Sequence, residues 1–137
     1  MKLHYYVDGD AFISAGEASS EVKNVLKQLG IDPAIIRKIA ISMYEAEMNM
    51  VLHANGGEID VKVTPEKINI ILKDQGPGIP DIELAMQEGF STADQKIRDL
   101  GFGAGMGLPN IKKYSDELQI QSEVGKGTEV KITVWLK

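Results

Sequence analysis

Cysteine is absent from this 137-residue chain. Its absence excludes disulfide bonds, zinc sites with thiolate ligands and catalysis by a cysteine nucleophile. No apolar run reaches the roughly 18 residues that a membrane-spanning helix needs, and residues 1–6 (MKLHYY) lack the apolar core of a signal peptide. We therefore expect a cytoplasmic protein that does not bind to membranes.

Basic residues are too few to suggest a nucleic-acid partner. The chain has 15 Lys and Arg residues against 20 Asp and Glu residues, which gives a net charge of −5, whereas binding to nucleic acid depends on neutralising phosphates with Lys and Arg. Hydrophobic residues make up 43% of the chain and charged residues 26%, as is usual in globular proteins. The length suits a single domain over residues 1–137.

Several familiar catalytic motifs are also missing. There is no G-x-x-x-x-G-K-[ST] phosphate loop, because Gly127 follows Lys126 and Ile120 stands where the first glycine should be. Residues 97–100 (IRDL) resemble part of the catalytic loop of eukaryotic-type protein kinases, but its histidine is missing and Ala104 stands at the asparagine position. No Ser/His/Asp arrangement and no H-E-x-x-H zinc motif is visible.

Glycine, by contrast, is concentrated in one region. Half of the 14 glycines fall between Gly76 and Gly107, and six of these seven lie in two clusters, at residues 74–78 (DQGPG) and 101–107 (GFGAGMG). Glycine lets the backbone approach a ligand closely. Asp74 could accept a hydrogen bond from an exocyclic amine such as that of adenine, although a proline-containing turn is the alternative. Amides of the second cluster could wrap a polyphosphate ahead of a helix N-terminus, although a hinge is the alternative.

A polar row on a predicted helix precedes these clusters. Glu45, Asn49 and His53 are spaced four residues apart and project from one helix face. A carboxylate there could accept a proton from an attacking hydroxyl, and an amide oxygen suits Mg²⁺, which keeps waters and takes phosphate ligands. A solvated polar face is the alternative. Together with the glycine clusters, this row predicts a site for ATP and a divalent metal.

Hydrophobic periodicity predicts strands near residues 3–7, 59–63, 68–72, 118–121 and 130–136. It predicts helices over residues 18–29, 33–53 and 80–88 and from residue 108, with a loop or lid over residues 89–107. Residues 55–57 (NGG) are expected to end the second helix. This order favours an α/β (α+β) two-layer sandwich with a mixed, mainly antiparallel sheet and helices on one face.

In this order the motifs resemble those of the GHKL ATP-binding superfamily, which has the Bergerat fold. Residues 45–54 (EAEMNMVLHA) are similar to the helical asparagine motif of bacterial anti-sigma-factor serine kinases, and residues 74–79 (DQGPGI) to the adenine-binding motif. Residues 90–92 (FST) and 103–108 (GAGMGL) resemble the ATP lid and its glycine end, and residues 125–128 (GKGT) the final glycine-threonine motif. The resemblance covers nearly the whole chain and implies binding of ATP with Mg²⁺.

The resemblance also implies individual roles. Glu45 would be the catalytic base, Asn49 the metal ligand and Asp74 the partner of the adenine amine. The full set implied to bind the nucleotide and its metal is Asn49, His53, Asp74, Gly76, Gly78, Ile79, Gly101, Gly103, Ala104, Gly105, Met106, Gly107, Leu108 and Thr128. Some anti-sigma kinases carry an arginine where Gly103 and Ala104 stand here, so the cation that stabilises the transferring phosphoryl is unassigned between Lys96, Arg98 and a partner.

Among members of the superfamily, the small serine kinases fit a chain of this size, because histidine kinases, gyrase and chaperones need further domains. Residues 74–82 and 88–92 look closest to the switch kinases of stressosome signalling. The resemblance implies a serine/threonine kinase that phosphorylates a small STAS-domain protein in bacterial sigma-factor partner switching, with a sigma factor or a PP2C-type phosphatase as a further partner and a homodimer as an open alternative. The rival readings are a nucleotide-gated anti-sigma binding module with little kinase activity and a detached histidine-kinase domain.

Overall fold

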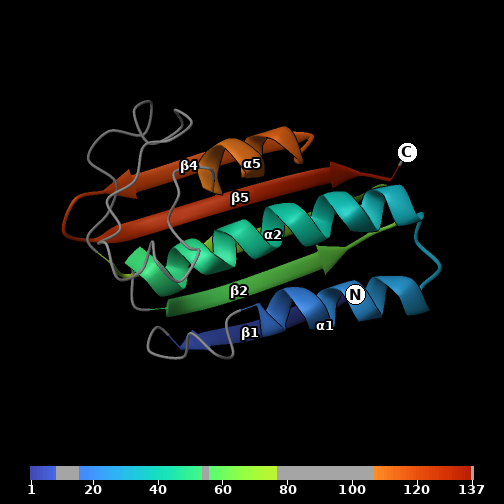
Figure 1. Cartoon of the computed structure of the whole chain (residues 1–137), viewed down its shortest axis with the longest axis horizontal. Helices are drawn as coiled ribbons and strands as arrows, with labels where there is room; N and C mark the ends of the chain where they lie inside the picture. Colours follow the sequence, from blue (N-terminus) through green and yellow to red (C-terminus); the bar gives the residue numbers. More distant parts are fainter. Residues whose placement is uncertain (9–15, 54–55, 77–106, 137) are drawn as a thin grey trace, which may run out of the picture.

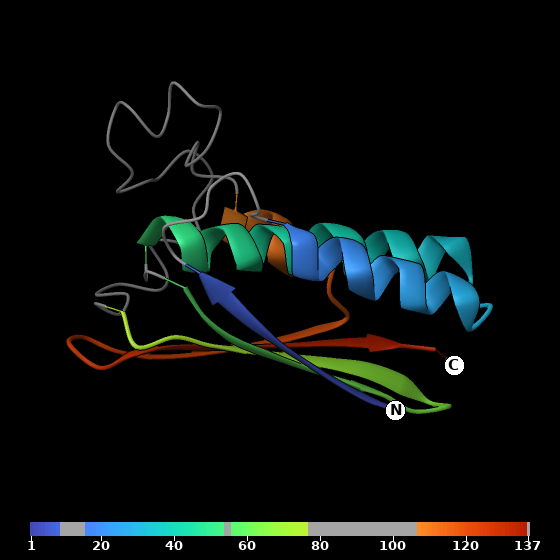
Figure 2. The ribbon, with the colours of Figure 1, turned by 90° about the horizontal axis from the view of Figure 1, so that it is seen from below.

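A computed structural model of the protein describes residues 1–8, 16–53, 56–76 and 107–136. These residues form two layers, a five-stranded sheet and a set of helices that cover one of its faces (Figures 1 and 2). Within the described residues, no helix combines the length and the apolar character needed to cross a membrane.

The sheet has the strand order β1-β2-β3-β5-β4, and each neighbouring pair is antiparallel. Two hairpins, β2–β3 and β4–β5, lie side by side, and the amino-terminal strand joins the edge of the first hairpin. The strand bounds are β1 (Lys2–Asp8), β2 (Gly56–Val63), β3 (Lys67–Lys73), β4 (Glu117–Glu123) and β5 (Gly127–Trp135).

Three helices lie on one face of this sheet: α1 (Glu17–Gln28), α2 (Pro33–His53) and α5 (Gly107–Lys113). The α1 helix stops before Gly30, whose φ of 75° is accessible to glycine without strain. The Asp32 carboxylate accepts the N–H of Ala34 at 2.8 Å, and Pro33 occupies the first turn of α2. Both helix boundaries thus follow from local capping chemistry.

The core lies between the two layers. Alternate residues of each strand face the helices, as the burial of every second side chain in β3 illustrates. Apolar side chains of all three helices meet them. The fully buried members include Val22, Leu26, Ile39, Met43, Ile59, Val61, Ile68, Ile70, Leu72, Ile111, Ile132 and Val134.

The predicted two-layer fold with a mainly antiparallel sheet is confirmed, and all described strand pairs are antiparallel. The second helix ends at His53, before residues 55–57, as expected. Two strands begin earlier than predicted: β2 starts at Gly56, where Gly56 and Gly57 pair with Asp8 and Val7, and β5 starts at Gly127. The helix predicted over 80–88 and the lid predicted over 89–107 lie outside the described residues, except for residue 107, which starts α5.

Candidate functional site

Asp74 follows the end of β3, and both its backbone and its side chain form hydrogen bonds to β5. Its N–H donates to the carbonyl oxygen of Thr128 at 3.0 Å. In return, Asp74 Oδ1 accepts the N–H of Thr128 at 3.1 Å and that of Gly76 at 3.0 Å. Among the described residues, no hydrogen bond engages Oδ2. One carboxylate oxygen is therefore occupied by the protein, and the other can accept a donor from a ligand.

Two glycines let neighbouring strands close around this segment. A Cβ at Gly57 would lie 2.2 Å from the carbonyl oxygen of Lys73 and 2.5 Å from the Met50 methyl group. A Cβ at Gly127, whose φ is 134°, would lie 2.1 Å from the carbonyl oxygen of Asp74. Because backbone atoms cannot yield at such distances, both strands can reach Asp74 only where the side chain is missing.

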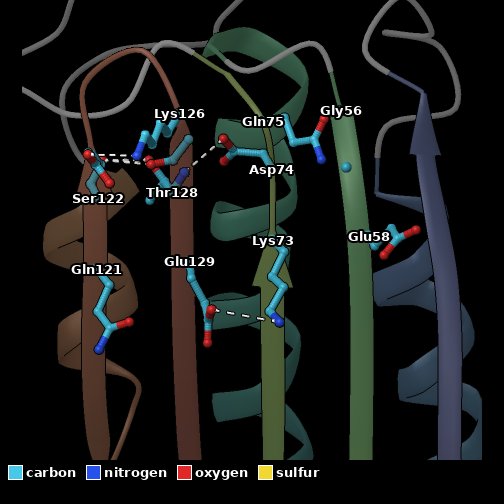
Figure 3. A pocket seen from close by; sticks show the side chains of 13 residues that line it. Gly56, Glu58, Lys73, Asp74, Gln75, Gln121, Ser122, Lys126, Thr128 and Glu129 are labelled. Atoms are coloured by element: carbon cyan, nitrogen blue, oxygen red, sulfur yellow. Dashed lines mark hydrogen bonds and ion pairs between the residues drawn. The ribbon is translucent and has the colours of Figure 1, made fainter.

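Thr128 is held by the antiparallel register of the second hairpin. The register pairs it with Ser122 of β4, and the two hydroxyl oxygens lie 2.8 Å apart. Ser122 Oγ also donates to the carbonyl oxygen of Gly127 at 3.3 Å. The Thr128 hydroxyl is therefore held by Ser122, while the backbone N–H of Thr128 contacts the Asp74 carboxylate (Figure 3).

The predicted polar row lies on α2, whose C-terminal end reaches the same end of the sheet. Glu45 and Asn49 are both half-buried. The carboxamide nitrogen of Asn110 in α5 lies 3.5 Å from Glu45 Oε1, at the long limit of a hydrogen bond. Within the described part of the chain, no hydrogen bond occupies the Asn49 carboxamide.

The two halves of the candidate site share one end of the molecule. The Met50 methyl group would meet the same Cβ at Gly57 that the backbone of Lys73 and Asp74 would meet, so α2 and the end of β3 close on Gly57 from two sides. In Figures 1 and 2 the end of α2, the end of β3 and the β4–β5 turn lie at the same end. The structure thus brings Asp74, Gly76 and Thr128 into contact and places Glu45 and Asn49 nearby on α2.

A hollow of about 880 Å³ borders Asp74 and Thr128 but opens on the other side of the sheet. Its lining includes Lys73, Gln121 and Glu129, which alternate with core residues of their strands and face away from α2 (Figure 3). Glu45 and Asn49 are not part of its wall. The hollow is therefore distinct from the predicted ATP pocket, which would lie on the α2 side.

The charges in this hollow are largely balanced within the protein. Lys73 Nζ lies 3.8 Å from Glu129 Oε2, and Lys126 Nζ lies 3.3 Å from Glu123 Oε1. Both pairs are well exposed to solvent, so they contribute little to stability.

The donor set suits a metal shared with phosphate better than a metal held by protein alone. Within the described residues, no group of three or more His, Asp or Glu side chains could hold a metal ion. Mg²⁺ commonly takes only one or two protein ligands and completes its shell with phosphate oxygens and waters. The Asn49 carboxamide, with Glu45 one turn away, fits this pattern.

Several predicted site residues are not described by the structure. These are Gly78, Ile79, Gly101, Gly103, Ala104, Gly105 and Met106. Gly107 and Leu108 begin α5, and His53 ends α2, but the side chains of Leu108 and His53 are not described.

The sequence matches the family model described as histidine kinase-, DNA gyrase B-, and HSP90-like ATPase over residues 34–137. The chain belongs to this family. Membership of this ATPase family carries ATP binding with it.

Relatives within the ATPase family narrow the comparison. The serine/threonine-protein kinase RsbT of Bacillus subtilis is 36% identical over 119 residues, which are 84% of each chain. An anti-sigma F factor of Caldanaerobacter subterraneus is 33% identical over 134 residues, covering 91% of this chain and 90% of that protein. The chain is thus similar to both kinases and anti-sigma factors of the family.

A solved structure shares the fold. The RsbU and RsbW domains of a Mycobacterium tuberculosis protein align with a TM-score of 0.65 and 18% identity. The alignment covers 97% of this chain and 32% of that longer chain. At this identity the likeness concerns the fold alone.

Some residues of the candidate site take part only through tertiary contacts, and the sequence alone did not identify them. Ser122 beside Thr128 could have been found by pairing the strands on either side of the Gly125–Gly127 turn. Asn110 and the close-approach glycines Gly57 and Gly127 carried no local signal of their contacts.

Proposed function

We propose that the chain is an ATP- and Mg²⁺-dependent protein serine/threonine kinase that acts in the cytoplasm on a small STAS-domain partner, within bacterial sigma-factor partner switching. Residues 1–137 would act as one kinase domain. The observation that carries nucleotide binding is Asp74, with Oδ1 held by two backbone N–H groups and Oδ2 without a hydrogen bond to any described residue.

Adenine would be recognised by the open oxygen. An exocyclic amine can donate to Asp74 Oδ2, while Gly76 and Thr128 keep the carboxylate from rotating. The Thr128 hydroxyl, fixed by Ser122, would add a polar contact or hold a water on the adenine side. His53, Gly78 and Ile79 would complete this half of the site.

The phosphates would lie toward α2 and the start of α5. Backbone amides of Gly101, Gly103, Ala104, Gly105, Met106, Gly107 and Leu108 would contact them. The Asn49 carboxamide oxygen would hold Mg²⁺, which when bound neutralises phosphate charge.

Glu45 would act on the acceptor hydroxyl. Its carboxylate would accept the proton of the partner's Ser or Thr hydroxyl as the new oxygen–phosphorus bond forms and the bond from the γ-phosphorus to the β–γ bridging oxygen breaks. The products are the phosphorylated partner and ADP. The Asn110 amide, 3.5 Å from Glu45 Oε1, faces the same carboxylate.

A phosphorylation assay tests the proposal. The chain would be mixed with candidate STAS proteins, Mg²⁺ and labelled ATP, and the product tested for acid-stable phosphoserine or phosphothreonine. Glu45→Gln should lower transfer by about 10²- to 10⁴-fold, because a general base is lost. Its ATP affinity should stay within about twofold, because the effect lies in the chemical step.

A matched control is Glu66→Gln, which removes one charge from an exposed position in the β2–β3 turn. It should leave transfer unchanged. Equal transfer by the Glu45→Gln variant and the wild type would remove Glu45 from the chemistry.

The similarity to an anti-sigma F factor favours a second candidate function. The chain could bind a sigma factor, or activate a PP2C-type phosphatase, in a nucleotide-gated manner with little transfer of its own, as a monomer or a homodimer. Tight, ATP-dependent capture of a sigma factor without transfer to any STAS protein would favour this alternative. An acid-labile phosphorylated product would instead point to a histidine kinase.

A further inference from the structure

Glu47 is a buried carboxylate that the proposed reaction does not use. It lies in α2 between Glu45 and Asn49 in the sequence, yet only 2% of its surface is exposed. Burial of a carboxylate is costly unless hydrogen bonds compensate it. The hydrogen bonds that compensate the burial of the Glu47 carboxylate therefore indicate its role.

Within the described part of the chain, the hydrogen bonds of the Glu47 carboxylate go to the beginning of α1. Oε2 accepts the N–H of Gly16 at 2.8 Å, and Oε1 accepts both the N–H and the hydroxyl of Ser19, at 3.0 and 2.7 Å. The N-cap residue of α1 is Gly16, which offers no side-chain cap of its own. A carboxylate from another helix thus supplies the missing cap, in the place where the helix dipole favours negative charge.

The contact is tight as well as polar. The Tyr44 ring covers Gly16 so closely that a Cβ there would lie 2.8 Å from Tyr44 Cε2. One turn of α2 therefore contacts the start of α1 in two ways, through the Glu47 cap and through the Tyr44 ring.

The geometry of α2 gives this cap a directional consequence. At 100° per residue, Asn49 lies about 40° from Glu45 around the helix axis, whereas Glu47 lies about 160° from it. Glu47 therefore faces α1 while Glu45 faces α5, where Asn110 lies. Figure 1 shows α2 between these two helices.

Apolar packing by itself would define the rotation of α2 poorly. Between residues 38 and 51 only Tyr44 is exposed, so buried side chains surround most of the helix. Apolar burial is non-directional, whereas the three hydrogen bonds to Glu47 require one orientation. On the α5 side, the Asn110–Glu45 contact is long at 3.5 Å.

We infer that Glu47 is a positioning residue, which fixes the rotation of α2 by capping α1 and thereby directs Glu45 and Asn49 toward the nucleotide. The inference rests on the proposed function for its catalytic consequence. Glu47 would contact neither the nucleotide nor the metal, but it would orient Glu45 and Asn49, which do.

The test compares Glu47→Gln with Val22→Ala. Gln keeps the shape of Glu47 but places an NH₂ group against an N–H or O–H donor, which breaks the cap. Val22 is fully buried in α1, so its truncation loosens the helix by lost packing and leaves the cap intact. Unfolding by urea would measure both losses of stability, and assays would run where both variants are folded.

Glu47→Gln should lower kcat for phosphoryl transfer by about 10- to 100-fold, because small displacements of reacting groups cost that much. Magnesium-free ADP binding, which depends on Asp74, should stay within about twofold of wild type. Val22→Ala should keep both. Equal kcat for the two variants would overturn the inference.

A ligand-free readout separates this inference from the proposed function. In the absence of nucleotide, the side-chain NH₂ resonances of Asn49 and Asn110 should shift in Glu47→Gln and stay in place in Val22→Ala. Unmoved resonances in both variants would overturn the positioning role. Shifted resonances in a protein whose wild type transfers no phosphate would retain it while sinking the kinase proposal.

Discussion

The two carboxylate oxygens of Asp74 have different surroundings, and this difference predicts the effect of one substitution. In Asp74→Asn the amide oxygen can still accept the N–H groups of Gly76 and Thr128. The NH₂ group would then replace Oδ2 and oppose an adenine amine, donor against donor. An unpaired polar group of this kind costs about 1–3 kcal/mol, so calorimetry should show ATP binding weakened by about 10- to 100-fold.

The control for Asp74→Asn is Asp60→Asn, which removes the same charge from the outer face of β2. Its ATP affinity should match wild type. Unaltered affinity in Asp74→Asn, with its melting temperature preserved, would contradict the assignment of Asp74 to the adenine.

His4 shows a second residue-scale effect, on the exposed face of the sheet. Its Nδ1 lies 2.6 Å from Asp60 Oδ1, directly across the β1–β2 register. The hydrogen bond to Asp60 raises the pKa of His4 above 6.5 and outweighs the smaller opposing effect of burial. The pair therefore stabilises the fold below the unfolded pKa of histidine and loses this effect as pH rises through the folded pKa.

An NMR titration of the His4 ring checks this directly. The midpoint should lie above 6.5 in the wild type and fall in Asp60→Asn, because the partner carboxylate is gone. A midpoint that does not change on substitution would show that the pair does not form in solution.

At the scale of helices and strands, the sequence predicted the boundaries that are set by residues close by in the chain. The Asp32 cap and the Gly30 stop bound α1 and α2 where the sequence placed them. Hydrophobic periodicity likewise placed β3 close to where it lies.

Contacts between segments that are far apart in the chain could not be predicted from local capping or periodicity. The sequence did not show that β2 already starts at Gly56, because a pair of glycines can mark either the end of a helix or the close approach of two strands. For Glu47, the sequence indicated only that it lies within the helical asparagine motif of residues 45–54. Its hydrogen-bond partners Gly16 and Ser19 are 31 and 28 residues away in the chain. No periodicity marks a cap supplied by another helix.

Gly57 allows a test of the close approach of β2 to the end of β3. In Gly57→Ala the new methyl group would lie 2.2 Å from a backbone oxygen, so the strands must separate. We expect a loss of about 2–3 kcal/mol in the free energy of unfolding, as for overpacked cores. Weaker ATP binding should accompany it, because Asp74 moves with the end of β3.

Gly125→Ala serves as the comparison for Gly57→Ala. Its site is open, so only the positive φ of 83° opposes the side chain, and the expected loss is about 1 kcal/mol. Urea unfolding measures both. A smaller loss at Gly57 than at Gly125 would show that β2 does not approach the backbone of Lys73 as described.

At the scale of the whole molecule, one carboxylate, that of Asp116, links the helical layer to the sheet by hydrogen bonds. Asp116 precedes β4 and joins three segments. Its Oδ1 accepts Lys38 Nζ of α2 at 2.9 Å, its Oδ2 accepts the N–H of Trp135 in β5 at 2.7 Å, and its own N–H donates to Thr133. Such a junction holds α2 against the sheet at the start of the same helix that carries Glu45.

The protonation of Asp116 sets the direction of a pH effect. Desolvation by itself would raise its pKa, but the hydrogen bonds from Lys38 and the Trp135 N–H, with the charge of Lys38, lower the pKa below 3.8. A depressed folded-state pKa stabilises the protein above the unfolded value and loses that stabilisation as pH falls through the folded value. The contribution should therefore be complete at neutral pH, decline as the pH falls past about 3.8 and vanish only below the folded-state pKa.

Asp116→Asn tests this junction. Because 44% of the Lys38 side chain is exposed, solvent screening keeps the expected loss at neutral pH to about 1 kcal/mol. Urea unfolding from neutral pH downward should show the wild-type and variant curves converging as the wild-type carboxyl takes up its proton. Glu66→Gln, which changes an exposed charge in the β2–β3 turn, should run parallel to wild type throughout. Curves for Asp116→Asn that stay equally far apart at every pH would mean that the substitution acts through packing and that the ionised carboxylate does not hold α2 to the sheet.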